Sequence, residues 1–237
     1  MRRVVIAALV AGVAAAYPTW AGAATFKGVV VAKSHARGTI AVASTRGGVH
    51  TLHVRKSVRV GAKVTATAAR RADGTYTTSR LVVRGRAHHA RIHGVVAART
   101  STRFLLSAGK SMIVVRLHTA ARALASARDN GPQVGDDVET EVDIDDDGDL
   151  DEESTEEKGE QSTVEVEGTV VAVSASSLQV KTEGGMTVTV TIPTGMTVNA
   201  AVGDEVELEA SVQGTTLTLV SIEDEENEDE GGGDDSD

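Results

Sequence analysis

The sequence predicts an all-β protein built from three small five-stranded barrels in tandem. The first basis is internal repetition, because three segments begin alike: KGVVVA at 27–32, HGVVAA at 93–98 and EGTVVAV at 167–173. The second is a V-G-x-x-V step that follows in each copy, with its glycine at positions 61, 135 and 203. The third is the alternation of apolar and polar residues in short segments separated by glycine-rich turns, which favours half-buried strands of a small closed sheet.

The strands between these landmarks can be placed in each copy. Segment 186–192, MTVTVTI, alternates apolar residues with threonines and is the clearest example. The other segments expected as strands are 39–42 and 50–54 in the first copy, 104–107 and 112–115 in the second, and 177–180 in the third. The second copy also contains TAARALASARDNG at 119–131, where Thr119 can cap a short helix and Asn130-Gly131 before a proline can end it.

The first 23 residues have the pattern of a secretory signal peptide. Arg2 and Arg3 precede an apolar run at 4–16, which is too short to hold the chain in a bilayer, and small residues at 21–23 form a cleavage pattern. We therefore expect a mature chain without a transmembrane anchor, secreted or associated with a bacterial cell envelope. The absence of cysteine from the sequence excludes disulfides and lipidated cysteines.

Repeats and composition together predict the domain organisation. Segments 152–163 and 224–237 are acidic and lack apolar residues, which is typical of disordered chain. Residues 84–92 are expected to join the first two barrels as an exposed basic linker. The predicted division is a signal peptide over 1–23, a basic barrel over 24–84, a second barrel over 92–151, an acidic linker over 152–163, an acidic barrel over 164–223 and an acidic disordered tail over 224–237.

The repeat motifs resemble those of a known group of domains. They are the G-x-V-V opening, the V-G-D-x-V step and the D-G turn that follows it at 73–74 and 147–148. Together they are similar to small OB-like β-barrel repeat domains of unknown function in secreted bacterial proteins. The first copy departs from the pattern, with Ala62 in place of the aspartate. The resemblance implies an OB-like fold over most of 27–222 and no particular activity, because OB folds carry many unrelated functions.

The stretch VDIDDDGDLDEES at 142–154 fits either an acidic hairpin or a metal loop. Asp147-Gly148 occupies the same place in its repeat as the D-G of the first copy, so we expect a two-residue hairpin turn in both. An EF-hand loop would need a glutamate at its twelfth position, where Ser154 stands. A weak calcium site stays open as an alternative. Its expected ligands are Asp143, Asp145, Asp147, Asp149 and Asp151.

Charge divides the chain into two halves. Residues 1–133 contain 22 Lys plus Arg and two acids, whereas residues 134–237 contain two Lys and 32 acids. The balances of +20 and −30 give the formal net charge of −10. A basic half of this kind favours binding to a polyanion, and the alternative is that the two halves attract each other and keep the chain soluble.

The densest basic stretch is RGRAHHARIH at 84–93. Its histidines could gather a transition metal, but the stretch has no cysteine or carboxylate to complete a ligand set. Its arginines are the expected polyanion contacts: Arg84, Arg86 and Arg91. Nucleic acid is disfavoured as the polyanion, because single-strand binding uses aromatic stacking platforms and the basic half has few aromatic residues.

These observations predict a secreted, non-catalytic binding or structural protein whose basic half binds an anionic envelope polymer. We expect no cofactor and no enzyme activity, because residues 134–237 contain no histidine and the chain has no G-x-S-x-G or phosphate-binding loop. Two alternatives stay open. One is a low-affinity calcium-binding extracellular module acting through the acidic half, and the other is an enzyme with a site that no motif marks.

Overall fold

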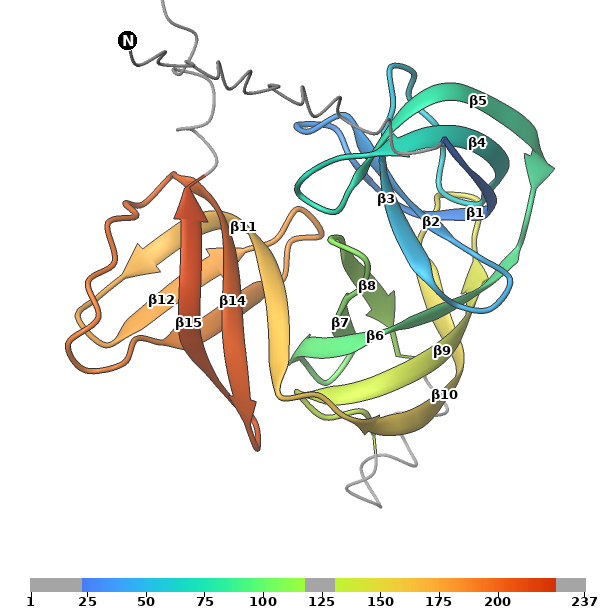
Figure 1. Cartoon of the computed structure of the whole chain (residues 1–237). Coiled ribbons are helices and arrows are strands. Elements are labelled where there is room, and N and C mark those ends of the chain that lie inside the picture. The colour runs from blue at the N-terminus through green and yellow to red at the C-terminus, as the bar shows by residue number, and fades with distance from the viewer. Residues whose placement is uncertain (1–22, 118–130, 225–237) are drawn as a thin grey trace, which may run out of the picture.

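The computed structural model describes residues 23–117 and 131–224, which form fifteen strands and no helix. The strands make three five-stranded sheets, each closed on itself as a barrel (Figure 1). Barrel 1 consists of β1 (Ala24–Ser34), β2 (Thr39–Ala43), β3 (Val49–His53), β4 (Ala62–Arg70) and β5 (Tyr76–Arg86). Barrel 2 consists of β6 (His89–Arg99), β7 (Arg103–Ser107), β8 (Met112–Arg116), β9 (Asp136–Ile144) and β10 (Leu150–Glu160). Barrel 3 consists of β11 (Thr163–Val173), β12 (Ser177–Lys181), β13 (Thr187–Thr191), β14 (Glu205–Gln213) and β15 (Thr216–Asp224).

The prediction of an all-β chain with three five-stranded units is confirmed. Every segment expected as a strand lies in one, to within one residue at each end. A short helix was expected over 119–131. All of that segment except Gly131 lies in the gap at 118–130, outside the described residues. Within the described ranges, no helix is long and apolar enough to cross a membrane.

The three barrels share one strand order. Within each barrel the first strand pairs with the second and the fourth, and the fifth strand pairs with the third and the fourth. All neighbours are antiparallel except the third and fifth strands, which pair in parallel as β3 with β5, β8 with β10 and β13 with β15. Each repeat of the sequence therefore corresponds to one closed sheet.

The glycine of the G-x-V-V opening lets two backbone segments approach closely. A Cβ atom at Gly94 would lie 2.6 Å from the carbonyl oxygen of Ser107, the last residue of the second strand of barrel 2. Gly28 and Gly168 approach the last carbonyl group of the second strand in their own barrels in the same way. A β-bulge follows in each first strand, and such bulges bend a strand. Only glycine fits at these positions, which explains why the motif recurs.

The glycine of the V-G-x-x-V step adopts a left-handed backbone conformation. Its φ angle is +83° at Gly61, +94° at Gly135 and +107° at Gly203, a region that favours glycine. In each barrel its amide donates to a carbonyl oxygen of the first strand, at 2.8, 2.8 and 2.9 Å. This hydrogen bond therefore joins the segment that leads into the fourth strand to the first strand, which helps to close the barrel.

Two stretches expected as linkers belong to strands. Because β5 ends at Arg86 and β6 begins at His89, only residues 87–88 join barrels 1 and 2. The expected acidic linker over 152–163 needs the same correction, since β10 runs to Glu160 and only 161–162 join barrels 2 and 3. Composition was misleading here because β10 pairs with β9 along its length, so its backbone groups are satisfied despite the charged side chains.

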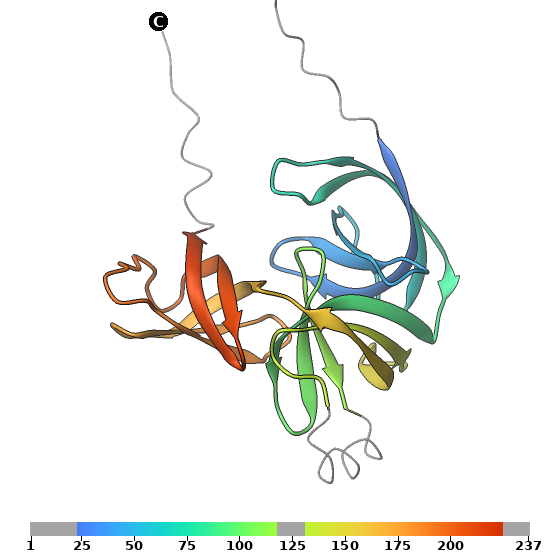
Figure 2. The ribbon, with the colours of Figure 1, turned by 60° about the horizontal axis from the view of Figure 1, so that its bottom comes forward.

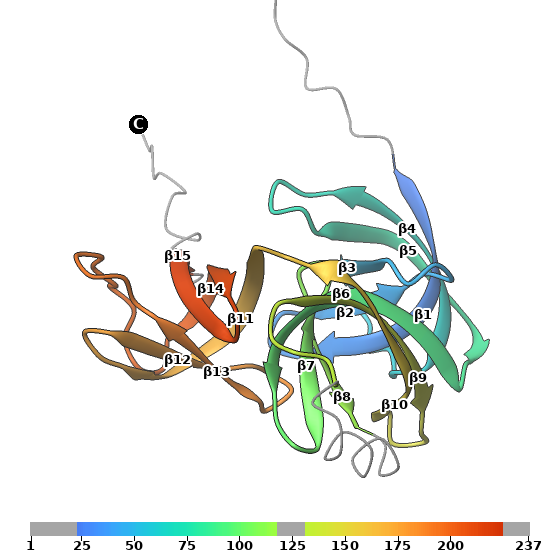
Figure 3. The same cartoon turned by 90° about the horizontal axis from the view of Figure 1, so that it is seen from below.

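The second and third strands of barrels 1 and 2 pack against the next barrel. Ala41, Ala43 and Val49 of barrel 1 belong to an apolar cluster that contains the core of barrel 2. Leu105 and Val114 of barrel 2 pack in turn with the core of barrel 3. Figures 2 and 3 show barrel 2, in green and yellow, in contact with both of its neighbours. The three barrels form one packed assembly rather than units on flexible linkers.

The corresponding face of barrel 3 is polar. By register, Gln179 and Thr189 stand where barrel 2 has Leu105 and Val114. Lys181 and Thr187 beside them are exposed. Polar residues replace the packed apolar residues of the earlier repeats, so this face is stable in water without another barrel over it.

Candidate functional site

Barrel 1 carries positive charge that the described part of the chain does not neutralise. Residues 24–86 contain 13 Lys plus Arg and one acid, Asp73. Three of these bases, Arg37, Arg71 and Arg86, form ion pairs. The ten others are exposed and form no ion pair with any residue that the structure describes: Lys27, Lys33, Arg46, Arg55, Lys56, Arg59, Lys63, Arg70, Arg80 and Arg84.

Six of these bases belong to β1, β4 and β5. Lys33 lies where β1 pairs with β2, Arg70 is the last residue of β4, and the other four lie where the three strands pair with one another. Lys27 of β1 lies opposite Thr65 of β4, and Arg80 of β5 lies opposite Thr67 of β4. Both threonines point to the same side of β4 as Lys63, so the three bases share one side of the sheet. Arg84 lies at the bulge between β4 and β5. We call Lys27, Lys63, Arg80 and Arg84 the basic sheet face. Because they project from hydrogen-bonded strands, their backbone positions are fixed before any ligand binds.

The three arginines predicted as polyanion contacts have different surroundings. Arg84 is exposed and belongs to the basic sheet face. Arg86 pairs with Asp146 at 2.6 Å and also donates to the carbonyl oxygen of Asp145. Arg91 pairs with Glu139 and Glu141 of β9, which keeps its charge engaged within barrel 2. Only Arg84 therefore has its charge available for a polyanion.

The aromatic rings of barrel 1 contact one another rather than forming an open platform. Phe26, His50 and Tyr76 have ring centroids 4.6 to 5.8 Å apart in tilted or edge-on arrangements. Phe26 and Tyr76 also pack against the core of the barrel. Burial lowers the pKa of His50 below its usual value, so this ring adds less positive charge than an exposed histidine would at mildly acidic pH. The basic sheet face itself contains no aromatic residue.

The acidic stretch at 142–154 is a hairpin, as one of the two interpretations expected, but its turn is longer. The amide of Asp145 donates to the carbonyl oxygen of Asp149 at 3.2 Å, which leaves three residues in the loop rather than two. Gly148 has a φ of +90°, as the last position of such a loop requires. The Asp145 side chain accepts the amides of Gly148 and Asp149 at 2.8 and 2.9 Å and so holds the turn.

The guanidinium of Arg116 lies among three of the five carboxylates proposed as calcium ligands. Its nitrogens are 2.8 Å from Asp145, 2.9 Å from Asp149 and 3.0 Å from Asp151. The parallel pairing of β8 with β10 makes Arg116 the register partner of Asp151. The amide of Asp149, together with Arg116, lowers the pKa of Asp145 below its usual value. The chain thus supplies its own cation at this turn.

The two other proposed ligands lie apart from Arg116. Asp143 pairs with His89 at 2.7 Å on the neighbouring strand β6. Asp147 is exposed at the tip of the loop and forms no ion pair within the described ranges. The structure therefore does not gather the five carboxylates at one point.

Removing the internal cation is expected to create calcium affinity. In an Arg116→Gln variant the carboxylates of Asp145, Asp149 and Asp151 keep their positions but lose their countercharge. A unit charge about 4 Å away is worth roughly 1 kcal/mol even in water, so calcium affinity should rise roughly fivefold or more. Calorimetric titration measures the change, and Arg103→Gln, which removes a neighbouring arginine without a described ion pair, is the control. Equal calcium binding by the parent chain and both variants would contradict this role of Arg116.

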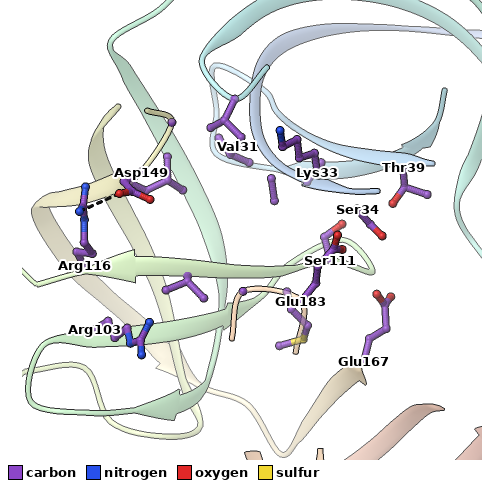
Figure 4. Close-up of a pocket in the computed structure, with 18 of the residues that line it drawn as sticks. Val31, Lys33, Ser34, Thr39, Arg103, Ser111, Arg116, Asp149, Glu167 and Glu183 are labelled. Atoms are coloured by element: carbon purple, nitrogen blue, oxygen red, sulfur yellow. Dashed lines mark ion pairs between the residues drawn. The ribbon is translucent and has the colours of Figure 1, made fainter. Parts of the chain in front are cut away.

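A cleft of about 530 Å³ lies where the three barrels meet (Figure 4). Lys33 from barrel 1 and Arg103 from barrel 2 line it, and neither forms an ion pair with a residue in the described ranges. Glu167 and Glu183 of barrel 3 line it as well, and Glu183 accepts the amide of His35 at 2.9 Å. The mixed charges of its walls make the cleft a less favourable polyanion site than the uniformly basic sheet face.

Sequence reasoning missed several of these residues. Lys27, Lys63 and Arg80 are dispersed over 54 positions of a basic sequence, so no local cluster marked them. Their shared face depends on the register of three strands. Arg116 was missed because its acidic partners follow it by 29 to 35 residues.

Comparison with known proteins gives little further information. No family model matches the chain, and no curated protein matches it. A solved structure to which the chain is similar is a multidomain protein with nucleic acid binding domains from Streptococcus pneumoniae. The two share 15% sequence identity over 82% of this chain and 72% of that chain, with a TM-score of 0.25. A similarity at that level carries no argument about the ligand of this chain.

Proposed function

We propose that this chain is an exported, non-catalytic protein of three OB-like barrels whose first barrel binds an anionic polymer through the basic sheet face. The observation that carries the proposal is the set of ten exposed bases of barrel 1 without described ion pairs, beside a single acid that is already paired. The shared strand order and barrel closure support the OB-like assignment. The signal-peptide pattern of residues 1–23 supports export.

The position of the ligand follows from how the barrels pack. OB-type barrels commonly bind ligands on their second and third strands. In barrel 1 this face is covered by barrel 2, where the hydroxyl group of Thr51 contacts Ser111 at 2.6 Å. The β1, β4 and β5 face carries the basic residues instead. The polymer therefore lies across the outer surface of the sheet, not in the usual OB groove.

The chemistry of this face favours a polymer with repeated phosphate or sulfate groups and no bases. Lysine and arginine neutralise such groups by releasing their counterions, which requires no shape-specific pocket. Base stacking would require ring faces open to the ligand, and Phe26, His50 and Tyr76 contact one another in tilted or edge-on arrangements. An envelope polymer with a phosphodiester backbone, of the teichoic acid kind, fits these requirements.

The acidic barrels give the bound polymer one preferred location. Acids of barrels 2 and 3 pair with bases of neighbouring barrels, as in Arg37 with Glu167 and Lys110 with Glu165. The acids left over repel a polyanion from those barrels. Attraction to barrel 1 and repulsion from the remainder orient the polymer without a pocket.

The experiment replaces the basic sheet face and measures binding of linear polyphosphate to the whole chain at low salt. The test variant changes Lys27, Lys63, Arg80 and Arg84 to glutamine. The control changes Arg46, Arg55, Lys56 and Arg59 to glutamine, which removes the same charge from exposed loop positions of the same barrel. We expect roughly a tenfold or greater loss in the test variant and a clearly smaller loss in the control.

The outcomes separate the parts of the proposal. Equal losses in both variants would contradict the assignment to the sheet face. Absence of polyphosphate binding by the parent chain would contradict the function. Much tighter binding of single-stranded DNA than of polyphosphate, per phosphate group, would replace the base-free polymer with a nucleic acid.

A further inference from the structure

We propose that His89, Asp143 and Glu153 form a binding site for a first-row divalent metal ion such as Zn²⁺. The Nδ1 atom of His89 is 2.7 Å from Oδ1 of Asp143 and 3.4 Å from Oε2 of Glu153. One donor atom from each residue lies within 4.8 Å of the other two. This site is separate from the basic sheet face, and no local sequence motif marks it.

The three side chains project from three adjacent strands of barrel 2. His89 of β6 and Asp143 of β9 are register partners. Glu153 is the extra residue of a β-bulge in β10, where the register passes from Glu152 to Ser154. A bulge redirects a side chain, and this one brings Glu153 next to the His89–Asp143 pair. Because the strands are fixed in a closed sheet, the donor atoms are held close together before a metal binds.

The internal repeats show that the fold does not require these side chains. The same bulge occurs in barrels 1 and 3. By register, barrel 1 has Ala23, Ala69 and Ser79 at the three positions, and barrel 3 has Thr163, Ser211 and Val220. Neither barrel has an imidazole or a carboxylate there. The three metal-ligating groups therefore occur together in one copy of a scaffold whose other two copies have the same strand order without them.

The donor set selects the kind of metal. One imidazole nitrogen and two carboxylate oxygens suit Zn²⁺ and related ions, whereas Ca²⁺ and Mg²⁺ prefer oxygen ligands alone. Donor atoms around a tetrahedral zinc ion are about 3.3 Å apart, given bonds of about 2.0–2.1 Å. The distances from Nδ1 of His89 to the two carboxylates, 2.7 and 3.4 Å, lie on either side of that value, so small side-chain rotations would complete the geometry. All three residues are exposed, which leaves room for water at the remaining metal positions.

The site lies at a cleft of about 560 Å³ between barrels 1 and 2. His89 and Glu153 line it from barrel 2, and Ser44 and Thr45 line it from barrel 1. The guanidinium of Arg91, also in its wall, is engaged by Glu139 and Glu141 and does not compete for the proposed ligands. A metal with open positions would therefore face a space large enough for a small anionic ligand.

Zinc titration of the whole chain, without a polyhistidine tag, tests the site by calorimetry. We expect one saturable site whose affinity falls roughly tenfold or more in both His89→Ala and Glu153→Gln. His88→Ala is the matched control, since His88 is an exposed neighbouring histidine outside the cluster, and it should leave the affinity unchanged. The visible absorption of bound Co²⁺ should disappear in the same two variants.

Three results would overturn the proposal. They are the absence of saturable zinc binding by the parent chain, an equal loss in His88→Ala and His89→Ala, and full affinity in Glu153→Gln. Circular dichroism of each variant shows whether it is folded. Since the three residues are exposed and barrels 1 and 3 lack them at the same positions, we expect all of the variants to fold.

Discussion

Replacing Gly28 with alanine is expected to lower the free energy of unfolding by about 3 kcal/mol, the upper end of the usual cost of overpacking. The added Cβ atom would collide with the carbonyl group of Ala43 and lie 2.9 Å from Cγ1 of Val42. Both residues belong to β2, whose residues are all buried, so the backbone of barrel 1 itself must shift. Chemical denaturation followed by far-ultraviolet circular dichroism measures the loss.

Gly48→Ala is the matched control in the same barrel. A Cβ atom there would have the Ser44 hydroxyl oxygen as its nearest neighbour, at 3.6 Å, which is ordinary contact. We expect a change of less than about 1 kcal/mol, as at most surface positions. If Gly28→Ala were as stable as Gly48→Ala, the close backbone approach would not explain the glycine of the repeat motif.

The strands could be predicted from the sequence because their signals are local. The period of two in segment 186–192 and the recurrence of the same landmarks in three copies located all three sheets. The glycines at 28, 94 and 168 could be recognised as landmarks, but their reason is a contact with a strand more than ten residues away. Repetition in the sequence therefore showed that these glycines matter, and the structure shows the close backbone contact that requires them.

The linkers were misjudged because composition does not report backbone pairing. Residues 152–160 are acidic, yet β9 supplies hydrogen-bond partners along the whole strand. Lys158 lies 2.8 Å from Glu156 and thereby relieves part of the repulsion among the acids. A charged strand is stable when its partner strand and its counterions are present, and neither can be read from the segment alone.

The sites depended on contacts across long sequence separations. The basic sheet face requires the register of β1, β4 and β5, and the pairing of Arg116 with the acidic hairpin requires the parallel closure of β8 with β10. The charge asymmetry of the chain indicated an excess of bases in residues 1–133, but not which of them pair with acids of the other half. The two predicted contacts Arg86 and Arg91 were engaged by acids that the sequence places about 50 to 60 residues later.

Salt is expected to weaken polyanion binding strongly. Four phosphate contacts on a flexible chain correspond to a slope of about −3 for the logarithm of the binding constant against the logarithm of the salt concentration. Affinity for polyphosphate should therefore fall about 50-fold between roughly 50 and 200 mM sodium chloride. The glutamine variant of the basic sheet face should show a much smaller slope, because it neutralises fewer phosphates and so releases fewer counterions from the polymer.

The salt slope measured for the whole parent chain is the most direct test of the account, because it reports how many bases contact the polymer. The test requires no assumption about which polymer the protein binds in the cell. Fluorescence anisotropy of labelled polyphosphate at several salt concentrations gives it. We predict a slope near −3 that becomes markedly shallower when Lys27, Lys63, Arg80 and Arg84 are neutralised. A slope near zero, or the same slope in the parent and the variant, would contradict binding through the basic sheet face.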